Sequence, residues 1–379
     1  MKKILFRKLL SDYMRFLLLA LISTSVVIWV FQAVNYLDIM IEDGRDYLVY
    51  LNYTLLSFPK ILSKIFPFVL FFTLFYVTIK YELNNELMIF WNFGVHKIHL
   101  VNFIFKFSII LLLTQILFTS FIVPKSQDLA RSFIRSSTVN FYGNFIKSQK
   151  FNDTIKGVTI YSEKKDKNGN LYNLYLKKEI GKNEFQITYA KKGEFIEIGN
   201  NPILVLFEGA TITSKDNNVT NISFSKSDFS LSNLETNTTT YKKTQEISSL
   251  KLVECTKNYF KFDKENFETN SKNIENCSAE NISNIFKELY KRFVIPFYIP
   301  LLSLIPFILI LTSKESLNFN KVRIFTFLIG LLAIIFSETT IRLVSNKIFQ
   351  NISLVVIPLL FILLIYFFLF YKFKLNYKN

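Results

Sequence analysis

Three stretches of the chain carry no charged side chain for more than twenty residues. They lie between Arg15 and Asp38, between Arg292 and Lys314, and between Lys347 and Lys372, and they contain 22, 21 and 24 residues. A helix that crosses the hydrocarbon core of a membrane needs about 20 mostly apolar residues. Each stretch therefore predicts one transmembrane helix, which excludes a wholly soluble or disordered protein.

Three shorter uncharged stretches predict three more spans. They cover residues 107–124, 65–79 and 324–337, with 18, 15 and 14 residues. The last two reach spanning length only if Lys64, and the pair Glu338 and Arg342, are admitted into the span or its rim. Ionisable residues in spans are costly and tend to face a bundle interior or an aqueous cavity. The sequence thus predicts three spans, a long insert and three further spans.

The positive charges give the orientation. Thirteen Lys and Arg residues lie before span one, between spans two and three, between spans four and five, and after span six, against four in the opposite short loops. Since cytoplasmic loops carry the excess of Lys and Arg, both termini are expected in the cytoplasm and residues 125–291 outside. This predicts three parts: residues 1–124, the insert 125–291, and residues 292–379.

The net charge of +16 does not indicate a nucleic-acid partner, because the positive residues flank apolar runs instead of forming one basic face with interleaved aromatic residues. The chain has ten Gly and two His, and no phosphate-binding, nucleophile-elbow or zincin motif. We therefore predict no catalytic residue, no cofactor and no metal site.

The first part of the insert predicts short β-strands. Seven segments rich in β-branched or aromatic residues recur along it, separated by turn residues such as Asn, Gly and Pro: 158–161, 171–176, 185–189, 195–198, 203–207, 210–213 and 219–224. This spacing is typical of an antiparallel sandwich or jelly roll. The insert from about residue 244 reads as mixed or helical. Cys255 and Cys277 both fall there, either as a disulfide formed in an oxidising periplasm or as two unpaired thiols.

Several motifs resemble the lipopolysaccharide-export permeases, the LptF/LptG family. They are the Phe66-Pro67 segment of span two, the loop motifs Asn84-Asn85-Glu86-Leu87 and Phe93-Gly94-Val95, Pro124 after span three, and Glu288-Leu-Tyr-Lys-Arg292 followed by Pro296 and Pro306. With the topology, the resemblance covers essentially the whole chain. The segments 207–209, 227–229 and 340–346 look more like the F-type than the G-type subunit. Residues 32–36 and Asp38 depart from the basic residues that such proteins carry after span one.

The resemblance implies a fold, a location and partners. The fold is an α-helical membrane protein of six transmembrane helices (3+3) with an inserted periplasmic β-jelly-roll-like domain, in the bacterial inner membrane. The partners are an LptG-like permease, forming a heterodimer, an LptB-like cytoplasmic ATPase dimer that hydrolyses ATP, and an LptC-like periplasmic bridge protein. The cargo is lipopolysaccharide, which the permease extracts and passes onward through its β domain.

The loop from Tyr81 to Leu100 is longer than a turn between spans requires. A short helix here, ended by Gly94, could dock the ATPase through Glu86 and the apolar Leu87, Ile89, Phe90 and Trp91. Alternatively it lies in the lipid headgroups. The resemblance favours docking.

Charged residues near the outer ends of the spans also allow two interpretations. Lys60, Lys64, Arg342 and Lys347 are candidates for binding phosphorylated lipid headgroups, or they simply extend their charges to the membrane surface. Glu288 and Arg292, four residues apart before span four, either transmit movement between the span and the outer domain or cap the membrane boundary.

In the β domain, Ile160, Leu174, Ile187, Ile196 and Val205 are candidates to line an apolar groove for acyl chains. The same alternation is equally consistent with a closed core. The residues alone are consistent with two functions. One is a transport subunit; the other is a non-transporting scaffold or mechanotransmitting permease-like protein that regulates a periplasmic or cell-wall partner. An open groove favours transport.

Overall fold

The computed structural model describes residues 2–37, 47–136, 146, 148–155, 158–166, 169–181, 184–198, 201–215, 218–230, 242–261, 267, 274–346 and 348–375. It divides into two compact units, which we treat separately. The helical unit comprises Met1–Val30, Ser57–Asp128 and Lys242–Asn379, and the sheet unit comprises Phe31–Leu56 and Leu129–Tyr241.

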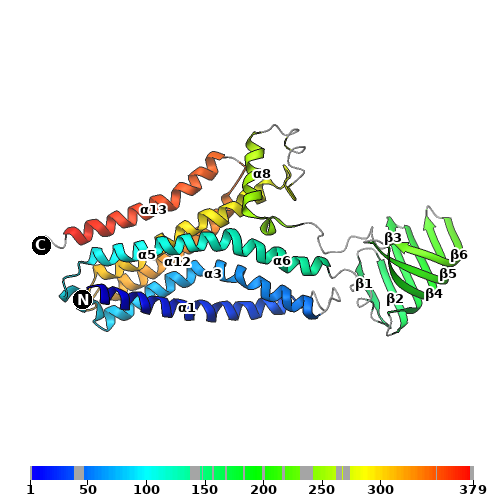
Figure 1. The fold of residues 1–379 in the computed structure, drawn as a ribbon, viewed down its shortest axis with the longest axis horizontal. Helices are drawn as coiled ribbons and strands as arrows, with labels where there is room; N and C mark the ends of the chain where they lie inside the picture. The colour runs from blue at the N-terminus through cyan, green and yellow to red at the C-terminus, as the bar shows by residue number, and fades with distance from the viewer. Residues whose placement is uncertain are drawn as a thin grey trace. The chain divides into compact units, whose positions relative to one another are not determined.

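The six predicted spans are confirmed as helices long and apolar enough to cross a membrane (Figure 1). They are Lys2–Asn35, Tyr47–Leu83, Lys97–Ile134, Ile282–Leu311, Phe319–Leu343 and Phe349–Lys374. Four consist of one helix each: α1 (Lys2–Asn35), α3 (Tyr47–Leu83), α12 (Phe319–Leu343) and α13 (Ile348–Leu375). The helix α3 includes Lys64, and α12 includes Glu338 and Arg342, so the charged residues do lie within these helices.

The third and fourth spans change helix type along their length. The third runs through α5 (Lys97–Leu117), the π-helix η1 (Phe118–Ile122) and α6 (Val123–Ser136). The fourth runs through α10 (Ile282–Leu289), the π-helix η3 (Tyr290–Val294), η4 (Ile295–Phe297), α11 (Tyr298–Leu304) and η5 (Ile305–Leu311). Pro296 and Pro306 are the second residues of η4 and η5. Proline has no N–H to donate within a regular α-helix, so it interrupts the helix at these points.

The core of the helical unit is built around the fourth span, which is the most buried of the six. Its Tyr298 and Phe307 are fully buried with Phe71 of α3. The Phe71 ring lies against Gly330 of α12, where an added Cβ would lie 1.9 Å from Phe71 Cζ. Close approach over a small residue is typical of membrane helix packing.

The sheet unit contains one six-stranded antiparallel sheet in the order β1-β2-β3-β4-β5-β6 and not a closed barrel (Figure 1). Its strands are β1 (Phe151–Ile155), β2 (Val158–Lys165), β3 (Leu171–Gly181), β4 (Glu184–Ile198), β5 (Asn201–Lys215) and β6 (Asn218–Ser230). The predicted segments 185–189 and 195–198 belong to one strand, as do 203–207 and 210–213. The strand β1 was not predicted. Gly193 and Gly209 lie inside β4 and β5, between the segments that were predicted separately.

The sheet bends along one line, which we call the crease. Successive residues on one face of a strand are normally two apart, but here the step is three from Leu171 to Leu174, from Ala190 to Gly193 and from Leu206 to Gly209. These steps are aligned: Leu174, Ala190 and Gly209 pair across the sheet on one side, and Leu171, Gly193 and Leu206 on the other. Asn173 and Glu208 take positive φ angles of 50° and 51° at this line.

The bend encloses an apolar inner face. Its buried side chains come from both sides of the crease: Val158, Ile160, Leu171, Leu174, Leu176, Ala190, Leu204 and Leu206, packed with Phe195, Phe224 and Phe229. The ammonium of Lys178 lies 5.8 Å from the ring centre of Phe229. Across the paired strands, Lys178 is in register with Thr220 of β6. Phe229 is nine residues further along β6, and in a flat strand it would lie about 30 Å from Thr220. The sheet is therefore strongly folded over this face.

Candidate functional site

A cavity of about 320 Å³ lies in the helical unit among α3, the third and fourth spans and α12. Charged side chains line much of it: Lys60, Lys64, Lys291, Arg292, Glu288 and Glu338. Arg292 Nε donates to Glu288 Oε1 at 3.0 Å, so these two charges offset each other. Three lysines then face one remaining carboxylate, Glu338. We call this positively charged space the lysine cavity; its charge suits an anionic group.

The structure separates the four predicted headgroup residues. Lys60 and Lys64 both line the lysine cavity, one turn apart on α3. Arg342 is exposed near the end of α12 and is not among the lining residues. Lys347 lies outside the described residues. Sequence spacing thus brought two of the four together, because the i, i+4 relationship places them on one face of a helix.

Arg292 is the most connected of the predicted site residues. Its side chain is 3% exposed. Besides Glu288, it donates from Nη1 to Ile247 O at 2.9 Å and Ser249 Oγ at 3.0 Å, and from Nη2 to Gln245 O at 3.0 Å. Burial of a guanidinium is stable only when its charge and N–H groups are satisfied, as here. The free-energy cost of removing the Arg292 guanidinium from water is thus offset by four hydrogen bonds.

These contacts hold residues 242–249, which we call the return segment because the chain passes through them after the last strand. The segment contains η2 (Thr244–Glu246) and leads into α8 (Ser249–Lys261). Lys242 Nζ pairs with Asp128 Oδ2 at 3.1 Å, Lys60 Nζ donates to Gln245 Oε1 at 3.0 Å, and Ser249 Oγ donates to Ser120 O at 2.7 Å. The predicted junction residues Glu288 and Arg292 therefore join the fourth span to the return segment.

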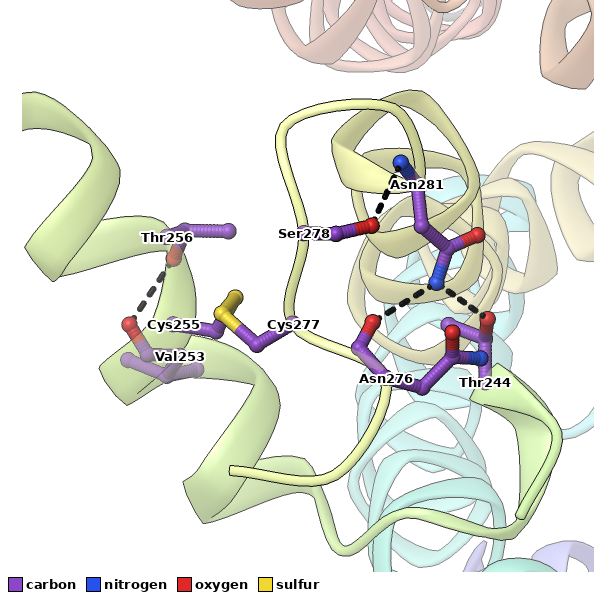
Figure 2. The surroundings of a disulfide bond; sticks show 8 residues. All are labelled: Thr244, Val253, Cys255, Thr256, Asn276, Cys277, Ser278 and Asn281. Atoms are coloured by element: carbon purple, nitrogen blue, oxygen red, sulfur yellow. Dashed lines mark hydrogen bonds between the residues drawn. A yellow bond between two sulfur atoms is a disulfide. The ribbon is translucent and has the colours of Figure 1, made fainter. Parts of the chain in front are cut away.

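A disulfide closes the same region. Cys255 of α8 is bonded to Cys277, with the Cα atoms 6.1 Å apart. Figure 2 shows Asn281 beside it, whose Nδ2 donates to Thr244 Oγ1 at 3.2 Å and to Asn276 O at 2.9 Å. The structure thus selects the disulfide over two free thiols and ties α8, the return segment and the start of α10 into one cluster.

The loop between the second and third spans forms the expected short helix, α4 (Glu86–Asn92). Gly94, with φ of 68°, donates its N–H to Trp91 O at 2.9 Å just after the helix. Leu87 and Phe90 are 2% and 3% exposed and pack in the core of the helical unit. They therefore anchor α4 and present no surface to a partner, contrary to the docking role expected of them.

The outward surface of α4 is formed by neighbours of those residues. Ile89, Met88 and Phe93 are 45%, 52% and 43% exposed, and of these three only Ile89 was a docking candidate from the sequence. Glu86 lies 3.8 Å from Lys8 Nζ. Trp91 is partly buried, with Lys97 Nζ 5.8 Å from its ring centre.

The five groove candidates divide between the two faces of the sheet. Ile160 and Leu174, 1% and 0% exposed, lie on the inner face. Ile187 and Ile196 alternate with the inner positions Thr188 and Phe195, and Val205 alternates with Leu204 and Leu206, so these three lie on the opposite face. At the crease, the residues of β4 on the inner face are Ala190 and Gly193. Both are small, so a search for alternating large apolar residues does not identify them as inward-facing.

Sequence reasoning missed the polar residues that complete the lysine cavity. Gln127 of α6 is 5% exposed and lines the cavity, and its Nε2 has no hydrogen-bond partner among the described residues. Gln245 also lines it. Neutral residues from distant segments carry no periodic or charge signal that predicts their meeting. Among the described residues, no group of three or more His, Cys, Asp or Glu is placed to hold a metal ion.

Comparison with known proteins bears directly on this arrangement. The model of the family described as lipopolysaccharide export system permease LptF/LptG matches residues 7–372. No curated protein compared with the chain matches it. The match spans all six apolar helices and the inserted sheet, which agrees with a multi-pass membrane permease. This chain belongs to the family of lipopolysaccharide export permeases LptF/LptG.

Proposed function

We propose that the chain is the F-type permease subunit of a transporter that extracts lipopolysaccharide from the bacterial inner membrane. It pairs with an LptG-like permease, and an LptB-like ATPase dimer in the cytoplasm hydrolyses ATP for both. The sheet unit passes the lipid to an LptC-like periplasmic bridge protein. The F-type assignment rests on the segments 207–209, 227–229 and 340–346.

The observation that carries this proposal is the bent sheet with its apolar inner face. Its apolar positions continue across the sheet to β6: Leu174 is paired through Ala190 and Gly209 to Phe224, and Leu204 pairs with Phe229. Ile222 lies on the inner face, level with Thr188 and Thr211, and is 63% exposed. The inner face is therefore packed at β2 and β3 and accessible along β6. An apolar surface of this kind binds acyl chains at about 0.8 kcal/mol per buried methylene.

The orientation follows from the charge distribution of the sequence: cytoplasmic termini, α4 in the cytoplasm, and residues 125–291 in the periplasm between the membrane parts 1–124 and 292–379. A disulfide between Cys255 and Cys277 agrees with an oxidising compartment. A cysteine introduced at Asn170 in the turn before β3 should react with an impermeant reagent from the periplasmic side. Reaction only from the cytoplasm would overturn the topology.

The lysine cavity supports a second element of the proposal, contact with the phosphorylated headgroup. Lys60 and Lys64 provide ammonium groups next to apolar lining from Pro67, Phe68 and Ile334. This combination matches a lipid with an anionic head and apolar chains. Arg342, exposed beyond the cavity, adds positive charge on α12.

Photo-crosslinking distinguishes transport from the scaffold alternative. Photoreactive residues at Thr211, which is partly exposed, and at the exposed Ile222 probe the inner face, and residues at the exposed Ile196 and Ile212 probe the opposite face. In the assembled complex, the inner positions should capture lipopolysaccharide when the ATPase hydrolyses ATP, and the outer positions should not. Equal capture on both faces, or inner capture indifferent to ATP, would contradict transport through the sheet and favour a scaffold.

A further inference from the structure

We propose that the lysine cavity is a sensor for an anionic lipid headgroup, which acts by taking the Lys60 ammonium from Gln245 and so loosening the return segment. The inference rests on the proposed function only in assigning the headgroup to the transported lipid. The recognised chemistry is a phosphate monoester or a similar anion. The inference adds a structural response to binding: an anion in the cavity removes one of the contacts that hold residues 242–249.

The hydrogen bond that would be exchanged joins a charged donor to a neutral acceptor. Lys60 Nζ is half-buried and donates to a neutral amide oxygen, Gln245 Oε1, at 3.0 Å. An anionic oxygen adds a charge–charge attraction to the ammonium, which the neutral amide oxygen lacks, and this attraction is strengthened where water is partly excluded. A phosphate that reaches Lys60 therefore competes successfully with Gln245.

The cavity has the room and the unused donors that such a ligand needs. Its volume of about 320 Å³ lies at the lower end of the range of ligand pockets, ~300–1,000 Å³. The amide Nε2 of the buried Gln127 lines it without a partner among the described residues. A buried donor left without an acceptor is unfavourable, and an anion oxygen would satisfy it. Lys64 and Lys291 supply further positive charge.

The remaining contacts of the return segment limit the response to a loosening. Arg292 binds the carbonyls of Gln245 and Ile247 and the hydroxyl of Ser249, all next to its ion pair with Glu288. Asn281 holds Thr244, and the Cys255–Cys277 disulfide fixes α8 just beyond (Figure 2). These contacts do not involve Lys60. Loss of the Gln245 side-chain bond therefore frees one attachment at the point where the chain returns from β6.

Hydrogen exchange measured by mass spectrometry on the full chain in nanodiscs tests the proposal. Three preparations are compared: phosphatidylcholine alone, phosphatidylcholine with bisphosphorylated lipid A, and phosphatidylcholine with inorganic phosphate in the buffer. Lipid A should accelerate exchange of the 242–249 amides about fivefold, the change expected when one hydrogen bond is lost. Acceleration by lipid A alone shows that the headgroup must arrive on a lipid, and acceleration by both shows that phosphate suffices.

Three variants control the experiment. Gln245→Ala should exchange rapidly in all three preparations, which shows that the readout detects a free segment. Lys60→Gln should remove the response to lipid A, whereas Lys106→Gln, an exposed lysine of the third span outside the cavity, should keep it. Identical 242–249 exchange of the unchanged protein in all preparations, with Gln245→Ala still accelerated, would overturn the sensor. Lipid capture on the inner face of the sheet would then leave the transport proposal standing.

Discussion

The hydroxyl oxygen of Thr119 lies 3.0 Å from the backbone carbonyl oxygen of Arg292, 173 residues away in the fourth span, and shares its one hydrogen between this carbonyl and two in its own helix, Gln115 O at 2.9 Å and Ile116 O at 3.2 Å. Both residues lie in π-helical turns, Thr119 in η1 and Arg292 in η3. A π-turn inserts one extra residue into the helix and frequently marks a functional position. The two irregular turns therefore meet where the Arg292 side chain holds the return segment.

Replacing Thr119 by Val should weaken this junction without changing side-chain volume much. The bond to Arg292 O is lost, and polar bonds between membrane helices contribute about 0.6 kcal/mol on average. A small fall in the melting temperature of the purified chain is expected. Thr114→Val is the control, because the Thr114 hydroxyl bonds only within its own helix, to Leu111 O at 2.8 Å, in the described residues. Equal effects of the two changes would argue against the interhelical bond.

Removing the Arg292 side chain should be far more damaging. Arg292→Met leaves Glu288 without its partner and removes the donor to Gln245 O, Ile247 O and Ser249 Oγ. Breaking a buried ion pair from one side costs about 3–5 kcal/mol, whereas replacing both charges by apolar residues is often tolerated. We therefore expect Glu288→Leu combined with Arg292→Met to recover part of the thermal stability lost in the single variant. A single variant as stable as the unchanged protein would contradict this account.

The spans and the short helix α4 were predictable because their signals are local. Uncharged length specifies a span whatever surrounds it, and Gly94 ends α4 through its own backbone conformation. The disulfide was recognised as an option because it involves two residues of distinctive chemistry. Glu288 and Arg292 were singled out together by their spacing of four residues, which places them on one face of a helix.

The face of each strand was harder to predict, because the crease changes the period from two to three. Ile187 carries the stronger apolar signal, yet the inner face takes Thr188, since Ala190 and Gly193 continue that face across the bend. The burial of Leu87 and Phe90 likewise depends on contacts with other spans that sequence spacing does not report. Gln127 and Gln245 meet only after folding.

The surface of α4 makes a prediction about the ATPase. Met88→Lys should lower ATPase co-purification while leaving the melting temperature of the permease unchanged, because the side chain is 52% exposed and a charge against an apolar contact is unfavourable. Glu86→Lys should also weaken the association with the ATPase. This change also places a second positive charge next to Lys8. Leu87→Ala should instead lower stability by about 2–5 kcal/mol. Full ATPase recovery with Met88→Lys would exclude this surface from docking.

An exposed ion pair at the crease predicts a pH dependence. Lys191 Nζ donates to Glu208 Oε2 at 2.8 Å, and this bond, with the charge attraction, holds the pKa of Glu208 below its ordinary value of 4.5 and raises the pKa of Lys191 above 10.5. The stability from Glu208 is thus full above pH 4.5 and is lost as pH falls through its lower folded-state pKa. Lys191→Met should return the pKa of Glu208 towards 4.5 in a carbon-13 carboxyl NMR titration. An unchanged titration would show that the pair does not form in solution.

The two glycines of the crease should differ in their tolerance of a methyl group. A Cβ added at Gly209 would lie 2.1 Å from the Tyr189 carbonyl oxygen and 3.0 Å from Ala190 Cα, both backbone atoms of the adjacent strand. One added at Gly193 would meet chiefly the Leu174 side chain, at 2.9 Å, which can rotate away. Overpacking typically lowers the free energy of unfolding by about 1–3 kcal/mol. We expect the loss for Gly209→Ala to lie at or above the upper end of this range and the loss for Gly193→Ala to lie near its lower end.

Limited proteolysis of the full chain measures this difference within the sheet, because cleavage in β4 and β5 reports their local opening. Gly209→Ala should be cut there much faster than the unchanged protein, and Gly193→Ala only slightly faster. If the strands separate at Gly209, the inner face also opens, so ATP-dependent lipid capture at Thr211 should fall with it. Equal protection of both variants would mean that the strands do not approach closely at the crease, and the folded-over inner face would lose its structural basis.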